Sequence, residues 1–259
     1  MTSRIPIAVP VSGPLYEGHF PGRPILPGIG LLDLSIRALA AVGAAQALCE
    51  ITSLRLRKLV APGDSLELEV KAFEPDGSVR FEVRRAGEIV ASAGVILGVP
   101  STGAVPLERI GEARRVVGAP DLDLLLPHRP PMRFIEGIDA EMDDGVVCAV
   151  RVPGRSAFTE DGSAPALVAV EMAAQSAAVF EALRRSRQEE GAGPRIGYLV
   201  GARDVRLARA RVRADKTFSA TIRLSGVAPP LSTYVFSVEE GREVIASGTM
   251  STWLTATDA

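Results

Sequence analysis

The chain has 259 residues, 47% of them hydrophobic and 23% charged, and its formal net charge is −2. This near-balance argues against a nucleic-acid-binding protein, which would show a clustered basic excess. Cys49 and Cys148 lie far apart, so no disulfide framework is predicted and a reducing, cytoplasmic setting is the default. No N-terminal segment has the pattern of a signal peptide, and charges interrupt the two longest apolar segments, which argues against membrane spans.

In chain order, the first half predicts one buried helix followed by four strands. The segment Gly28–Cys49 is apolar almost all round, which is typical of a helix buried on most sides. Runs rich in β-branched residues or with alternating polarity follow it, separated by Pro, Gly and Asp turn signals. The predicted strands are Ile51–Val60, Ser65–Phe73, Ser78–Arg84 and Glu88–Val99.

The second half repeats this order, with an apolar helix from about Pro165 to Arg185 and four strand-like runs after it. The predicted strands are Ile196–Leu207, Thr217–Leu224, Ser232–Val238 and Glu243–Leu254. The last strands of the halves begin almost identically, with EIVAS at Glu88 and EVIAS at Glu243. We therefore predict two repeats, residues 1–99 and 121–259, joined by a linker over residues 100–120. Two unrelated α+β domains are the alternative.

Each predicted helix carries one carboxylate in its second turn, Asp33 in the first and Glu171 in the second. A carboxylate among apolar side chains destabilises the fold by several kcal/mol unless it is paired or protonated. Burial also raises the pKa of the acid, which suits a general acid near neutral pH. A purely structural ion pair with a nearby arginine is the alternative for each residue.

The sequence contains two histidines, which argues against a histidine-rich metal site. His19 lies in a Gly- and Pro-rich loop just before the first predicted helix, where it is a candidate general base. His128 lies in the segment LLPHRPP, for which we favour a structural role in the loop that leads into the second repeat.

The segment HFPGRPILPG, from His19 to Gly28, resembles the signature of β-hydroxyacyl-(acyl carrier protein) dehydratases of the hotdog fold. In that family the helix acid follows the histidine by fourteen residues, and Asp33 has this spacing from His19. In the second half, LLPHRPP and the ExxxQ pattern of Glu171 and Gln175 resemble elements of the same family. The chain thus resembles a fused pair of subunits, with a FabZ-like first half and an aryl-polyene-dehydratase-like second half. The implied fold is α+β, a double hotdog in which each central helix is wrapped by an antiparallel sheet and the repeats pack as a pseudo-dimer.

The two repeats depart from the family pattern in complementary ways. When the helix acids are aligned, the position matching His19 is Ala157, and the position matching Gln175 is Arg37. In this family the site forms between two hotdogs, one giving the histidine and the other the acid. The resemblance therefore implies one complete site, His19 with Glu171, and one vestigial site, Asp33 with Ala157. We expect Arg37 to neutralise Asp33, four residues away on the same helix face.

The resemblance implies dehydration of 3-hydroxyacyl thioesters to trans-2-enoyl thioesters in a fatty-acid, aryl-polyene or polyketide-type pathway, with no metal or organic cofactor. His19 would remove the C2 proton, Glu171 would protonate the leaving hydroxyl, and Gln175 would orient Glu171. The Gly28 N–H, at a helix N-terminus, is the candidate oxyanion donor. An apolar tunnel between the two helices would hold the acyl tail, lined by Leu31, Leu32, Val168 and Met172.

The implied partner is an acyl carrier protein, which is acidic, and Arg23 and Lys58 are weak candidates for its docking. Further homo-oligomerisation is left open. Two other functions compete with the dehydratase. A hotdog thioesterase would use a carboxylate and water without His19, and a non-catalytic acyl-binding protein would bind thioesters without turnover.

Overall fold

The computed structural model describes residues 4–20, 22–44, 46–100, 103–107, 114–116, 121–187 and 196–255. Within these residues, one sheet of twelve strands curves around two long helices, α1 (Gly28–Ala41) and α3 (Val168–Arg187). The sheet runs in the order β1-β3-β4-β5-β2-β10-β14-β13-β12-β8-β7-β6, and neighbouring strands of the described residues pair antiparallel throughout it.

The first repeat contributes α1 and one end of this sheet. Its strands are β1 (Arg4–Ala8), β2 (Ala47–Leu56), β3 (Ser65–Phe73), β4 (Ser78–Arg85) and β5 (Glu88–Gly98). Strand β2 follows α1 in sequence but lies at the inner edge of this half, next to the second repeat.

The second repeat contributes α3 and the other end of the sheet. Its strands in the large sheet are β7 (Ile135–Met142), β8 (Gly145–Arg151), β10 (Gly197–Leu207), β12 (Thr217–Ala228), β13 (Leu231–Glu240) and β14 (Glu243–Leu254), with β6 (Arg114–Arg115) at the edge. A separate two-stranded sheet pairs β9 (Ser163–Pro165) with β11 (Arg211–Arg213), and α2 (Leu122–Leu125) is a single turn.

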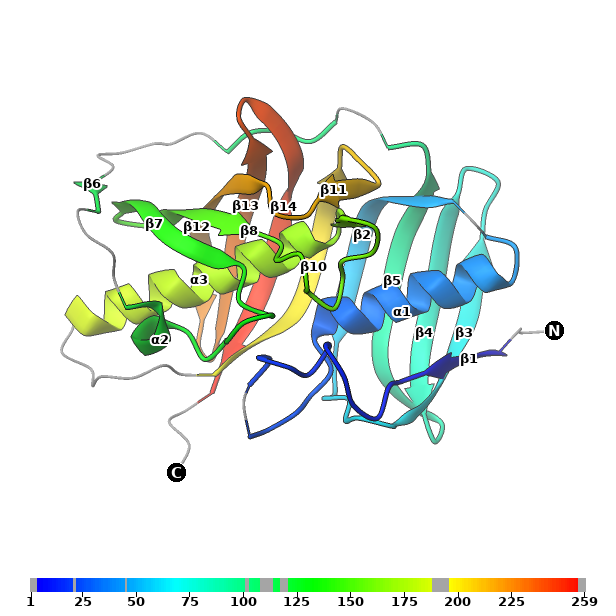
Figure 1. Cartoon of the computed structure of the whole chain (residues 1–259). Helices are drawn as coiled ribbons and strands as arrows, with labels where there is room; N and C mark the ends of the chain where they lie inside the picture. Colours follow the sequence, from blue (N-terminus) through cyan, green and yellow to red (C-terminus); the bar gives the residue numbers. More distant parts are fainter. Residues whose placement is uncertain are drawn as a thin grey trace.

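The two repeats are joined along β2 and β10, the strands that follow the two helices. These strands pair antiparallel, from Arg55 opposite Gly201 to Glu50 opposite Arg206. Figure 1 shows that α1 and α3 have their N-terminal ends near the middle of the molecule and run towards opposite sides. The first turns of both helices are thereby brought to the junction between the repeats.

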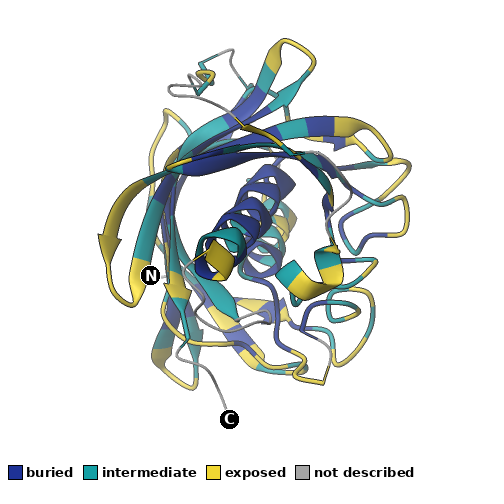
Figure 2. Ribbon diagram, turned by 90° about the vertical axis from the view of Figure 1, so that its left-hand side faces the viewer, coloured by how far each residue is buried: buried dark blue, intermediate teal, exposed yellow. Residues whose placement is uncertain are grey.

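Burial explains why both helices are so apolar. Figure 2 shows them inside the curve of the sheet, and most residues of α3 are buried. The inward faces of the strands pack against them, as the alternating burial of β3 and β4 shows. No helix of the described residues is long and apolar enough to cross a membrane.

The predicted helices need corrected ends. The first stops at Ala41 instead of Cys49, because the chain turns at Gly43 (φ 102°), whose N–H bonds the carbonyl of Ala40. The second begins at Val168 instead of Pro165, because residues 163–165 form strand β9. Glu171 therefore lies in the first turn of α3, not in the second as predicted.

Several strands were missed in the sequence. Strand β1, which precedes α1, is one of them. Strands β7 and β8 form a hairpin over residues 135–151, where the sequence predicted neither helix nor strand. The alternating residues of that stretch and its Asp-Asp-Gly turn are the signal that could have found the hairpin. Of the predicted linker, residues 101–102, 108–113 and 117–120 lie outside the described part of the chain.

Candidate active site

The first functional side chain, His19, is held by the loop before α1. It is 6% exposed, and its Nδ1–H donates to the carbonyl of Ile25 at 2.9 Å. A carbonyl only accepts, so this bond fixes the proton of the neutral ring on Nδ1 and leaves the lone pair on Nε2. The loop thus presents Nε2 as a proton acceptor, with the adjacent Phe20 in a left-handed backbone conformation (φ 55°).

The loop of His19 also contacts the loop that carries His128. The N–H of Arg129 donates to the carbonyl of Gly18 at 2.8 Å. Gly18 has φ 77°, and a Cβ there would lie 1.9 Å from the carbonyl oxygen of Arg129, so only glycine fits. This close backbone approach brings the two histidines together, and their ring centroids lie 5.5 Å apart.

Glu171 reaches the same place from the first turn of α3. It is 4% exposed, and Gln175, one turn later, donates to its Oε1 at 3.0 Å. The same amide donates to the carbonyl of Met132 at 2.8 Å and accepts from the N–H of Phe134 at 2.8 Å. Gln175 is therefore fixed by the backbone and in turn holds the carboxyl of Glu171 in one orientation.

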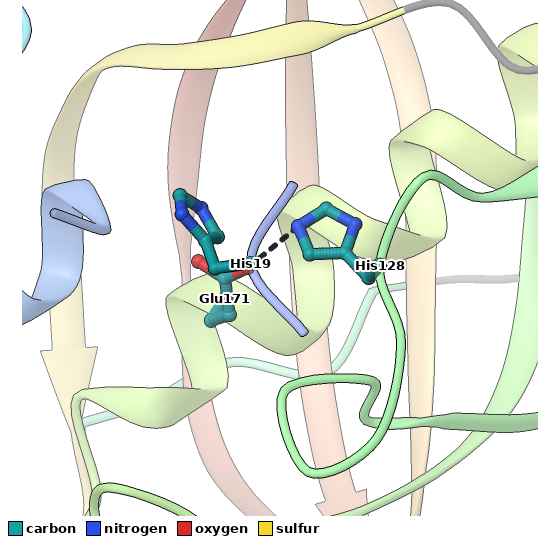
Figure 3. A group of neighbouring side chains, drawn as sticks. All are labelled: His19, His128 and Glu171. Carbon is teal, nitrogen blue, oxygen red and sulfur yellow. Dashed lines mark ion pairs between the residues drawn. The ribbon is translucent and has the colours of Figure 1, made fainter. Parts of the chain in front are cut away.

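Figure 3 shows the two imidazole rings on either side of the Glu171 carboxyl group. One nitrogen or oxygen atom from each of the three residues lies within 4.8 Å of the others. His128 Nε2 is 3.5 Å from Glu171 Oε1, and His128 Nδ1 is buried without a hydrogen-bond partner among the described residues. The geometry is that of an acid–base cluster in which one ring nitrogen, Nδ1 of His128, has no hydrogen-bond partner among the described residues.

Burial shifts all three protonation equilibria towards the neutral forms. Desolvation lowers the pKa of His19 to about 4, against the opposing effect of its bond to Ile25, and lowers that of His128 to about 3. Burial also raises the pKa of Glu171, while the Gln175 hydrogen bond works in the opposite direction. A neutral imidazole beside a protonated carboxyl group is the pairing needed for general base and general acid catalysis.

Two imidazoles and a carboxylate are also ligands that Zn²⁺ accepts. Atoms bound to one tetrahedral zinc ion lie about 3.4 Å apart. The three side chains span up to 4.8 Å, so they would have to move closer to hold an ion. The sequence predicted no metal site, and the arrangement fits an acid–base cluster better than a preformed metal centre.

A cavity opens beside this cluster and is lined by both repeats. From the first repeat it is lined by the His19 loop, by Gly28 and Leu31 of α1, and by the end of β2 and the residues after it. From the second repeat it is lined by His128, by one face of α3, and by β10, β13 and β14.

The predicted tunnel lining is only partly correct. Leu31 lines the cavity, whereas Leu32, Val168 and Met172 are buried in the core and are not among its lining residues. The cavity begins beside Gly28 and Leu31 of α1 and continues along α3, where residues spaced three to four apart from Glu171 form its wall.

Gly28, the predicted oxyanion donor, lies at the cavity as the first residue of α1. The first N–H groups of a helix have no intrahelical acceptor, so they can donate to a ligand. A Cβ on Gly28 would lie 2.3 Å from Leu56 Cδ1, so a side chain here would require Leu56 to move.

The second pair of residues, Asp33 and Ala157, lies away from this cavity. Arg37 Nε bonds Asp33 Oδ2 at 2.8 Å, as the sequence predicted, and Arg37 Nη1 bonds Glu160 Oε1 at 2.9 Å. Burial raises the pKa of Asp33, and Arg37 counters the shift. Ala157 is partly buried and packs against the core, so Asp33 has an arginine partner where Glu171 has two histidines.

The two candidate docking residues differ in position. Lys58 is exposed, lines the cavity and pairs with Glu88 at 3.0 Å. Arg23 is exposed in the loop before α1 and is not among the lining residues.

His128 is the site residue that sequence reasoning undervalued. The sequence favoured a structural loop, but the structure places its ring against Glu171. The histidine within the family-like element LLPHRPP was the available signal. It could not be used, because the contact with Glu171 spans more than forty residues of chain.

Comparisons with known proteins give the family to which each half of the chain is similar. Residues 120–258 match the family model described as "ApeP-like: ApeP dehydratase", and residues 2–94 match "ApeI-like: ApeI dehydratase". The chain is similar to a 3-hydroxyacyl-[acyl-carrier-protein] dehydratase FabZ of Anaeromyxobacter sp. (strain K), at 32% identity over 99 residues, which cover 33% of this chain and 64% of that protein. A second FabZ, from Clostridium perfringens (strain SM101 / Type A), is 32% identical over 106 residues, or 35% of this chain and 73% of that protein.

The dehydratase domain of the polyketide PpsC from Mycobacterium tuberculosis has a similar structure, with a TM-score of 0.69 at 16% identity, covering 99% of this chain and 94% of that one. This likeness confirms the predicted double hotdog fold. The molecule is thus of the double hotdog dehydratase class. The chain belongs to the ApeP-like dehydratase family, because the match to that family model, over residues 120–258, covers more than half of the whole chain.

Proposed function

We propose that this chain dehydrates 3-hydroxyacyl thioesters to trans-2-enoyl thioesters, with His19 as the base and Glu171 as the acid. The observation that carries the proposal is the buried placement of both groups, within 4.8 Å of each other, at a cavity lined by both repeats. Each repeat supplies one of the two groups, so we propose that residues 1–99 and 121–259 form one catalytic unit.

In the reaction, Nε2 of His19 takes the C2 proton, and the electron pair of that C–H bond forms the C2=C3 double bond. The C3–O bond breaks, and Glu171 gives its proton to the departing hydroxyl, which leaves as water. The N–H of Gly28 donates to the thioester oxygen as negative charge develops there. The carbonyl of Ile25 stabilises the proton on Nδ1 as the His19 ring becomes positive.

The thiol carrier in this proposal is an acyl carrier protein, the carrier in the names of the FabZ relatives. Lys58 lies at the exposed part of the cavity wall, where it would meet the phosphate of a carrier-bound prosthetic group. We place Arg23 nearby as a second docking residue for an acidic carrier surface.

The test uses the full chain with one 3-hydroxyacyl thioester, presented both on an acyl carrier protein and on coenzyme A. Mass spectrometry follows the loss of water, and a thiol reagent follows thioester cleavage. The proposal expects water loss without free thiol, faster on the carrier protein than on coenzyme A. Release of free thiol would instead establish a thioesterase, and tight binding without either product a non-catalytic acyl-binding protein.

A further inference from the structure

The cavity continues well beyond the catalytic acid. Glu171, Ala174, Ala178, Glu181 and Arg185 all line it, at spacings of three and four residues that define one face of α3. Because a helix rises 1.5 Å per residue, the ten residues from Glu171 to Glu181 correspond to about 15 Å along the axis. A ligand that reacts at Glu171 therefore has room for a long chain beside the helix.

The middle of this passage is apolar and built from small residues. Ala174, Ala177 and Ala178 line it from α3, and Leu199 and Leu254 line it from the strands. Short side chains on a helix leave space beside the backbone, and none of these groups can hydrogen-bond a ligand. This part of the wall fits a methylene or polyene chain.

The far end is polar and buried. Glu181 is 6% exposed, and its Oε1 accepts from the hydroxyl of Tyr234, which is completely buried. Its Oε2 accepts from Arg184 at 2.9 Å, while the hydroxyl of Ser232 lies 3.5 Å from Oε1. Glu181 and Ser232 both line the cavity. A carboxylate has about four acceptor positions, and the Ser232 contact is long enough to be replaced by a better donor.

The exposure of the wall shows which end is the mouth. Near His19 the lining includes exposed residues, Lys58 and Leu59, and Leu59 is 42% exposed. At the other end the α3 side of the wall is closed, because Glu181 and Arg185 are each only 6% exposed, while Ser232 on the strand side is partly exposed. A thioester that enters past Lys58 would therefore place its carbonyl end at His19 and the end of its acyl tail near Glu181.

We propose that the inner end of the cavity is a subsite for a hydroxyl group at the far end of the acyl chain, with Glu181 as its acceptor. The proposal rests on the proposed function for the direction of the chain. A methyl end would put apolar surface against a buried carboxylate, whereas a hydroxyl would donate to it. An extended acyl chain advances by about 1.2 Å per bond, the same as the backbone of an extended peptide. The acyl chain therefore needs roughly twelve bonds beyond C3 to cover the distance of about 15 Å from Glu171 to Glu181.

The experiment compares pairs of ligands of equal length that differ only in a terminal hydroxyl or methyl group. One set contains 3-hydroxyacyl thioesters of increasing chain length, and its readout is the ratio of kcat/KM within each pair. The other contains the matching thioether analogues, which lack the carbonyl needed for proton abstraction, and its readout is the ratio of Kd values by calorimetry. We expect a ratio near one for short chains and a preference of about tenfold for the hydroxyl where the chain reaches Glu181.

The variant that tests the acceptor is Glu181→Leu, which should reduce the preference to about one or reverse it. Ratios within one protein do not depend on the fraction of active molecules. If Glu181→Leu does not fold, Glu181→Gln keeps the shape and an acceptor oxygen but loses the charge, and the preference should fall to about threefold. The matched control is Glu240→Gln, on β13 and paired with Arg209 away from the cavity, which should keep the wild-type ratio.

A Kd ratio near one at every chain length in the wild type overturns the subsite, whatever the turnover shows. A full preference retained in Glu181→Leu also overturns it. Absence of water loss from every thioester would instead refute the proposed function, and the thioether Kd ratios would still decide the subsite.

Discussion

The two long helices carry acids in contrasting surroundings, Asp33 in the second turn of α1 and Glu171 in the first turn of α3. Glu171 lies against two buried imidazoles, and Gln175 fixes its carboxyl group. Asp33 pairs with Arg37, which also bonds Glu160 of the other repeat. Burial is the largest influence on both acids and raises both pKa values, and the residue four positions later opposes that shift, through an amide in one case and a guanidinium in the other. A neutral amide leaves Glu171 able to carry a proton, whereas a guanidinium stabilises the anion of Asp33.

The sharpest test of this contrast is to remove each acid in turn. Glu171→Gln and His19→Ala should each lower kcat by about 10² to 10⁴-fold, because they remove the acid and the base. Asp33→Asn should leave turnover within roughly twofold, since Asp33 does not line the cavity. Steady-state kinetics measures this, after circular dichroism has shown that each variant is folded. Inactive Asp33→Asn beside active Glu171→Gln would reverse the assignment of the two sites.

The pH profile tests the protonation states. Because the base must be neutral, activity should rise with pH through the lowered pKa of His19, at about 4. Because the acid must be protonated, activity should fall as pH rises through the raised pKa of Glu171. Gln175→Ala removes the hydrogen bond that lowers this pKa, so the alkaline limb should move to higher pH.

This profile is measured as kcat/KM against pH, which reports the free enzyme. Asp33→Asn is the matched control and should keep both limbs in place. An acid limb near the ordinary histidine pKa of about 6.5 would show that His19 is solvated and not buried.

The smallest expected effect concerns stability at the second pair. The Arg37 side chain is 46% exposed and that of Asp33 14%, so water screens the ion pair mainly from the arginine side. The coupling free energy between Asp33→Asn and Arg37→Gln should be about 1 kcal/mol or less. Urea unfolding of both single variants and the double variant measures it. A coupling of several kcal/mol would mean that this ion pair is a major stabilising element of the junction between the repeats.

Much of the site could be predicted because its residues lie at short, regular intervals in the sequence. The helix acids, the His19 loop and the partner residues Gln175 and Arg37 all follow from intervals of a few residues, which a helix or turn converts directly into geometry. The helix ends were less predictable. Apolar residues continue past Ala41 into β2, so composition alone does not show where Gly43 turns the chain.

The sequence by itself predicted two halves of like element order, one acid in each long helix, and an alanine at position 157 where the alignment expects a histidine. Tertiary structure alone decided that His128 contacts Glu171 and that the cavity follows α3 towards Glu181. The physical reason is that a hydrogen bond between the backbones of Gly18 and Arg129 leaves no trace in residue periodicity. Which face of α3 lines the cavity is likewise set by how the strands pack around a helix that is buried on most of its sides.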